Sequence, residues 1–195
     1  MSINIILGGN QGANEEGEVH AHYGVIAPDN VTLLVMGTVD HAGTGCRCSA
    51  HANARGIMGY LMQVDAPVVI ADMEAGLEHL GRGTIEHADA LLIVVEPYYR
   101  ALETGRRVHS LAADLGVPRI YTVANKVRTL TEETAVRAFC DQHDLNLIAV
   151  LPFDEQAIVA EAAGLTLLDV NSEGILVRAI ANLAAGLERA LNGTE

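Results

Sequence analysis

Short apolar runs of strand length alternate along this chain with longer segments in which apolar residues recur at helical spacing. The strand-length runs are Ile3–Leu7, Thr32–Met36, Val68–Ala71, Leu91–Val95, Ile120–Ala124 and Leu147–Leu151. Several are continuous rather than alternating, which is typical of parallel strands covered on both faces. Helical patterns lie at about 50–62, 100–115, 131–143, 155–163 and 173–191. This order predicts an α/β fold, an open, mostly parallel sheet with helices on both faces, most clearly over 65–195.

Two further features of the pattern concern helix packing and loops. In the expected helix at 100–115, four apolar residues can share one stripe at near-helical spacing: Leu102, Val108, Leu111 and Leu115. Gly116, followed by Pro118, is expected to end this helix. Residues 8–31 are polar and glycine-rich, which predicts a long polar loop with at most a short helix, and residues 192–195 are expected to fray.

Length and composition limit the class of protein. At 195 residues, half of them apolar, residues 1–195 are expected to form a single domain with a sizeable core. The net charge of −13 argues against nucleic acid and against anionic membrane surfaces as partners. No apolar run reaches about 18 residues, the length that predicts a membrane span. The start, MSINIILGG, lacks the basic region of a signal peptide. Three cysteines do not form a disulfide framework, so a reducing cytoplasm is the expected compartment.

The stretch Val68–Thr84, VVIADMEAGLEHLGRGT, carries the first candidate site. Asp72 ends an apolar strand, at the edge where open α/β sheets bind ligands. In nucleotide-hydrolysing proteins, such a carboxylate holds the Mg²⁺ shell or positions a water. Gly76 then permits a ligand to approach the backbone closely. The alternative is that Asp72 caps the following helix.

A second candidate is the Cys46-Arg47-Cys48 segment. In an extended segment the two thiols point to the same side and offer two soft ligands to Zn²⁺ or Ni²⁺. Two thiolates are half of a tetrahedral site, which a symmetric dimer would complete. The alternative is a pair of incidental thiols in a glycine-rich loop. Cys140, within an expected helix, is predicted to be a buried small apolar residue.

A third candidate is the strand that ends in Asn125-Lys126. The side-chain amide of Asn125 can pair with both a donor and an acceptor on a purine edge. Pro152-Phe153-Asp154 marks another strand end on the same rim. The alternative for Asn125 is a turn residue that terminates the strand.

One phosphate-binding signal is missing from these 195 residues. Lys126 is the single lysine, and Val127 rather than Ser or Thr follows it, so the sequence contains no GxxxxGK[ST] phosphate loop.

In this order the motifs resemble one family. GCRC at 45–48, DMEAGLEHLGRGT at 72–84, ANKV at 124–127 and LPFDEQ at 151–156 are similar to those of the CooC-type accessory ATPases. These belong to the MinD/ParA-like branch of P-loop NTPases and help insert nickel into carbon monoxide dehydrogenase. The resemblance runs from about residue 32 to 168.

The resemblance implies roles for the candidate residues. Asp72, with Gly76, would belong to the Mg²⁺ and switch region. Cys46 and Cys48 would bind Ni²⁺ or Zn²⁺ across a homodimer that ATP closes and hydrolysis reopens. Asn125, with Lys126, would contact adenine, and Pro152, Phe153 and Asp154 would lie beside it. Carbon monoxide dehydrogenase would be the client.

The chain also departs from the family pattern, which begins with a strand, a two-lysine phosphate loop and a helix. We therefore expect a partial MinD/ParA-like domain, without ATPase activity of its own. Ile3–Leu7 would fill part of the gap in the sheet, or the chain would need a partner such as a separately encoded N-terminal piece. Two other functions fit the sequence: a non-enzymatic pseudo-ATPase that serves as a dimerisation or scaffold module, and a MinD/ParA-like regulator unrelated to nickel.

Overall fold

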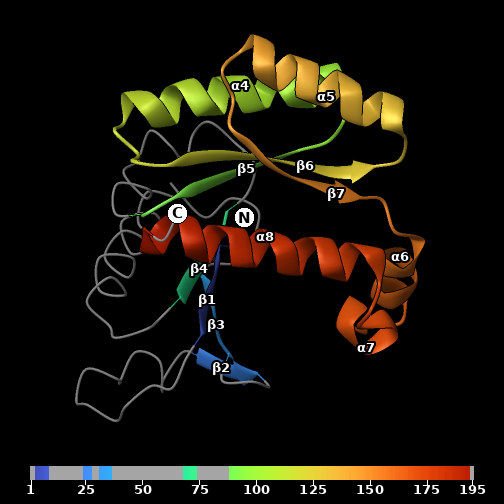
Figure 1. Cartoon of the computed structure of the whole chain (residues 1–195). Coiled ribbons are helices and arrows are strands. Elements are labelled where there is room, and N and C mark those ends of the chain that lie inside the picture. Colours follow the sequence, from blue (N-terminus) through green and yellow to red (C-terminus); the bar gives the residue numbers. More distant parts are fainter. Residues whose placement is uncertain (1–2, 9–23, 28–30, 37–67, 74–87, 194–195) are drawn as a thin grey trace, which may run out of the picture. The chain divides into compact units, whose positions relative to one another are not determined.

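The computed structural model describes residues 3–8, 24–27, 31–36, 68–73 and 88–193 (Figure 1). The chain divides into two compact units, Met1–His87 and Ala88–Glu195, and each is described by itself. Over the described ranges, the helices are too short or too polar to cross a membrane.

An antiparallel sheet of four strands forms the described part of the first unit. Its strands are β1 (Ile3–Gly8), β2 (Gly24–Ala27), β3 (Val31–Met36) and β4 (Val68–Asp72), in the order β2-β3-β1-β4. Both edges of β1 are paired, because Ile5 lies opposite Leu34 of β3 and Ala71 of β4. The run Ile3–Leu7 therefore occupies an interior position in this sheet.

This first sheet differs from expectation in two ways. The pairing is antiparallel, and residues 24–27, within the expected loop at 8–31, form a strand. Only three residues separate β2 from β3, and a connection that short cannot make the crossover that parallel strands need. Val25 and Ile26 supply the β-branched side chains that favour a strand.

The second unit contains the expected parallel sheet. Its strands are β5 (Leu91–Val95), β6 (Ile120–Val127) and β7 (Leu147–Pro152), paired in parallel in the order β5-β6-β7. Helices α4 (Tyr99–Asp114) and α5 (Leu130–Gln142) cover one face, and α8 (Ile175–Asn192) crosses the other (Figure 1). The predicted α/β architecture is confirmed here.

Two short helices connect β7 to α8. They are α6 (Glu155–Ala162), which was predicted, and α7 (Leu167–Asn171), which was not. A capping box holds the start of α7: Thr166 Oγ1 accepts from Asp169 N, and the Asp169 carboxylate accepts from Thr166 N. The expected helix at 50–62 lies outside the described residues.

The core of the second unit lies between the sheet and the helices α4 and α5. It contains Ile93, Val95, Leu102, Ala124, Val127, Val136, Cys140 and Leu145. Cys140 is 1% exposed, so the prediction of a buried apolar role is confirmed. Burial raises the pKa of its thiol, which keeps Cys140 protonated and unreactive.

The buried face of α4 differs from the predicted stripe. Leu102 is buried and Val108 packs against the core, but Leu111 and Leu115 are exposed. Gly105 and Ala112 take the buried positions instead. Small residues let the helix backbone approach β5 closely: a Cβ atom added to Gly105 would lie 2.6 Å from Val95 Cγ1. As predicted, Gly116 terminates the helix: it lies two residues beyond Asp114, the last helical residue, and its φ is 77°.

Strand β6 is irregular at its carboxyl end. Its register with β7 shifts between Ala124 and Val127, and Lys126 adopts a left-handed φ of 58°. This conformation is costly for a residue with a Cβ atom, and most costly for a β-branched one.

We predict opposite effects for two glycine-to-alanine substitutions. Gly105→Ala forces a methyl group against Val95, and the overpacking cost of about 1–3 kcal/mol exceeds the gain in helix propensity of about 1 kcal/mol. Gly186→Ala in α8 meets no atom within 4 Å and gains only the propensity. Urea unfolding should show the first variant less stable and the second more stable than the parent. A stability gain in both would contradict the close packing of α4 on β5.

A second pair of variants tests the backbone at position 126. Lys126→Gly and Lys126→Val both remove the ammonium group, so the difference between them isolates the left-handed conformation. The valine variant should be less stable than the glycine variant by about 1–2 kcal/mol. Equal free energies of unfolding would show that residue 126 does not hold a positive φ in solution.

Candidate functional site

The carboxyl ends of the three parallel strands meet at one rim of the sheet. Val127 lies opposite Pro152 in the strand register, and Phe153 N donates to Val127 O at 2.9 Å. The structure thus brings together five predicted residues: Asn125, Lys126, Pro152, Phe153 and Asp154. Ligands of open α/β sheets bind at this kind of rim.

Asn125 is half-buried at the rim, at the start of the irregular segment of β6. Its Oδ1 accepts from Lys126 N at 2.9 Å, which supports the left-handed turn. A carbonyl oxygen has two lone pairs, so Oδ1 retains one, and the amide nitrogen retains its two hydrogens. The side chain can therefore serve both as the predicted turn residue and as a donor and acceptor for a ligand.

An ion pair that the sequence did not predict links Lys126 of β6 to Glu96, the residue after β5. Lys126 Nζ donates to Glu96 Oε1 at 2.9 Å. The hydrogen bond and the charge of Glu96 raise the pKa of Lys126, so the ammonium stays charged. Both side chains are partly exposed, so water screens the pair and it adds little to stability. Its effect is to hold the ends of β5 and β6 together.

Phe153 and Asp154 connect the rim to the next elements. The guanidinium of Arg128 lies over the Phe153 ring, 3.5 Å from its centroid, a cation–π contact. Asp154 caps α6, because its Oδ1 accepts from Gln156 N at 2.9 Å. One face of the ring is thus covered by Arg128, and the carboxylate of Asp154 is partly engaged within the chain.

Glu96 and Arg128 are the rim residues that sequence reasoning missed. Glu96 directly follows the strand Leu91–Val95 and precedes Pro97, a strand-end signal of the kind used for Asn125. The sequence around Arg128 does not indicate its role, because its partner Phe153 follows a different strand.

The other predicted site residues lie in the first unit. Asp72 ends β4 and is exposed, opposite Asn4 of β1. Gly76, Cys46 and Cys48 lie outside the described residues, as does the helix that Asp72 would cap. Within the described ranges, His, Cys, Asp and Glu side chains do not gather in groups of three or more that could hold a metal.

Two curated proteins are similar in sequence. The carbon monoxide dehydrogenase accessory protein CooC of Rhodospirillum rubrum is 42% identical over 159 residues, 82% of this chain and 59% of that protein. An uncharacterized ATP-binding protein of Methanocaldococcus jannaschii is 41% identical over 135 residues, 69% of this chain and 52% of that protein. The chain thus spans little more than half the length of these relatives. No family model matches it.

A solved structure supports the fold. The ParA family ATPase from Chlorobium tepidum TLS has a TM-score of 0.60 at 17% identity, covering 92% of this chain and 77% of that one. At this identity the match concerns the fold alone. The sequence and the fold thus point the same way: the chain is similar in sequence to the accessory protein CooC over 82% of its length, and similar in fold to a ParA family ATPase.

Proposed function

We propose that this chain serves as an accessory protein that handles nickel for carbon monoxide dehydrogenase. The observation that carries the proposal is the 42% identity over 159 residues to the carbon monoxide dehydrogenase accessory protein CooC. The proposal places the protein in the cytoplasm, as a homodimer, with carbon monoxide dehydrogenase as its client.

The base of ATP would bind at the rim of the parallel sheet. Asn125 offers donors and an acceptor, and Phe153 offers a ring beside it. Pro152 and Asp154 would flank the base, and Lys126, held by Glu96, would contribute its charge. These residues fit the base of a nucleotide. ATP supplies the phosphates whose presence or loss switches proteins of this type.

Asp72 would serve the magnesium and switch region in this proposal, with Gly76 beside it. The support is the position of Asp72 at the end of β4 and the glycine-containing segment that follows it in the sequence. An exposed carboxylate is a hard oxygen ligand of the kind that Mg²⁺ prefers.

Cys46 and Cys48 would bind the nickel or zinc cargo. Their spacing supplies two thiolates per chain, and two chains would supply four. The third cysteine cannot take their place, because Cys140 is buried and its pKa is raised. Metal binding would therefore couple to the association of two chains.

A scaffold function without nucleotide chemistry is the second candidate. The single lysine and the missing GxxxxGK[ST] motif favour it for these 195 residues. The scaffold function requires that neither nucleotide nor metal changes the oligomeric state. Light scattering of the chain alone, with nucleotide and with metal would decide this.

Metal titration tests the nickel proposal. The reduced chain should bind Ni²⁺ or Zn²⁺ tightly, and the double substitution Cys46→Ser, Cys48→Ser should weaken binding at least about a hundredfold, since thiolates dominate affinity for such metals. Cys140→Ser is the matched control and should leave metal affinity unchanged. Equal affinity of the double variant and the parent would refute the assignment.

A further inference from the structure

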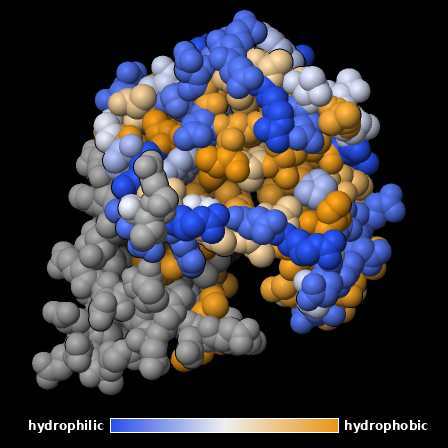
Figure 2. Space-filling view, viewed as in Figure 1, coloured by the Kyte–Doolittle hydropathy of each residue, from blue (hydrophilic) through white to orange (hydrophobic). Residues whose placement is uncertain are grey.

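A groove runs along the outer edge of β7, between α5 and α8. Ile148, Ala149 and Val150 of β7 form its floor, Leu130 of α5 lies on one side, and Ala179 of α8 lies on the other. Its volume is about 700 Å³. Figure 2 shows apolar side chains gathered between the two helices.

The groove continues toward the amino end of β7. A second hollow of about 430 Å³ shares the same three β7 residues and adds Tyr121, Leu183 and Leu187. The two hollows share the middle of the strand, and the first extends to Pro152 at its carboxyl end. One end of the groove is therefore mainly apolar, beside the carboxyl-terminal half of α8.

The backbone of β7 faces this groove with an unpaired edge. In the order β5-β6-β7, the strand is last, and its ladder runs to β6 alone among the described strands. The side chains of Leu147–Val150 are only half-buried. An edge strand of this kind offers a row of N–H and C=O groups that another extended segment can pair with.

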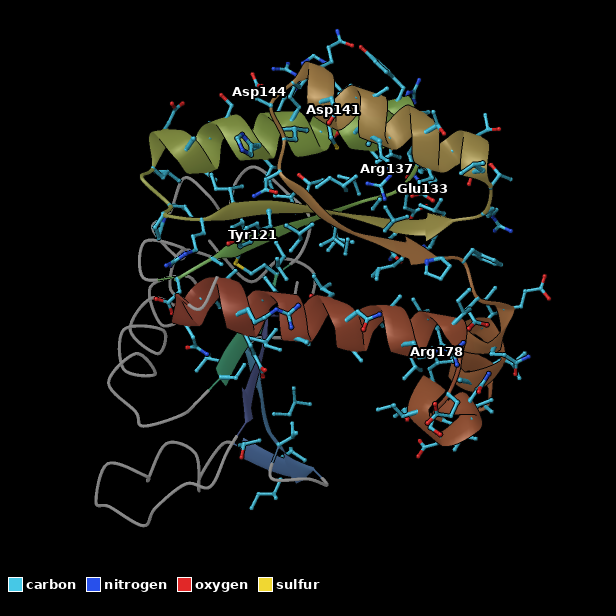
Figure 3. The ribbon with its side chains drawn as sticks, in the orientation of Figure 1. Tyr121, Glu133, Arg137, Asp141, Asp144 and Arg178 are labelled. Atoms are coloured by element: carbon cyan, nitrogen blue, oxygen red, sulfur yellow. The ribbon has the colours of Figure 1, made fainter. Side chains whose placement is uncertain are left out.

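Positive charge surrounds the other end of the groove. Arg128, Arg137 and Arg178 line it, and Glu133 is the single carboxylate among its lining residues. Figure 3 shows Arg137 on α5 and Arg178 on α8, at the same end of the groove, with Asp141 and Asp144 at the far end of α5.

Only one of these three arginines is neutralised by a carboxylate in the part of the chain that the structure describes. Arg137 pairs with Glu133 at 2.7 Å. Arg178 donates to the carbonyl of Glu173, and Arg128 lies over Phe153. In a chain with a net charge of −13, this local excess of positive charge selects an acidic ligand.

We propose that the groove binds an extended acidic segment of a partner protein, which adds as a strand to the edge of β7. Its carboxylates pair with Arg128 and Arg178 at the carboxyl end of β7, and its apolar side chains cover Leu183 and Leu187. The groove lies within the second unit and uses neither the metal-binding cysteines nor the rim side chain of Asn125. Arg128 and Pro152 border both the groove and the rim, so the two sites share these residues. The inference still goes beyond the proposed function, because its test needs neither nucleotide nor metal.

Peptide binding to the full 195-residue chain tests the proposal. The probe is a short fluorescein-labelled peptide of alternating valine and glutamate, and its counterpart carries lysine in place of glutamate. Fluorescence anisotropy should show saturable binding of the glutamate peptide, weakened by added salt, and at least about tenfold weaker binding of the lysine peptide. Equal binding of the two peptides would overturn the proposal.

Three variants locate the binding. Arg178→Glu should weaken binding of the glutamate peptide at least about tenfold, because it replaces an attractive charge with a repulsive one. Arg189→Glu is the matched control, since it reverses a charge on the same helix outside the groove and should change affinity less than about twofold. Asn182→Trp fills the groove without changing charge and should weaken binding at least about tenfold.

Circular dichroism of each variant checks that the fold is kept, and Asn182→Trp decides the matter if Arg178→Glu fails to fold. Identical affinities of the groove variants and the control would overturn the proposal. So would groove variants that alter self-association of the chain while no peptide binds, since the occupant would then be a second copy.

Discussion

The parallel pairing of β6 with both of its neighbours is the constraint on which the second unit depends. Its middle residues, Thr122, Val123 and Ala124, are at most 2% exposed, and burial of a side chain such as Val123 contributes about 1.5–3 kcal/mol. Because β5, β6 and β7 run in the same direction, their carboxyl ends lie at one rim. The pairing thus assembles Glu96, Asn125 and Phe153 from segments far apart in the sequence.

The same arrangement creates both candidate binding surfaces. At the rim, the irregular end of β6 turns away from regular pairing and presents Asn125, while the Glu96–Lys126 ion pair and the Arg128–Phe153 contact hold the strand ends. Along the side, β7 is left as an edge between two helices, which makes a groove. Arg128 contributes to both surfaces, since it lies over Phe153 and also lines the groove.

Much of this fold follows from local pattern, and the parts that do not have physical reasons. Continuous apolar runs predicted β5, β6 and β7, since such runs are typical of parallel strands, although Leu92 and Val94 of β5 are exposed among the described residues. The apolar stripe on α4 does not by itself mark the buried face. The sheet takes the small residues Gly105 and Ala112, while Leu111 and Leu115 are exposed. Asn125 lies near the end of β6 and Phe153 directly follows β7, so their places at the strand ends could be predicted from the sequence. The groove joins α5, β7 and α8 and has no local signal.

A nuclear magnetic resonance titration of the ¹⁵N-labelled chain tests the central claim, that the rim of the parallel sheet holds a nucleotide base. Adenosine monophosphate should shift the amide signals of Asn125, Arg128 and Phe153, whereas ribose 5-phosphate, which lacks the base, should leave them in place. Shifts confined to other parts of the chain, or equal shifts with both compounds, would contradict the account.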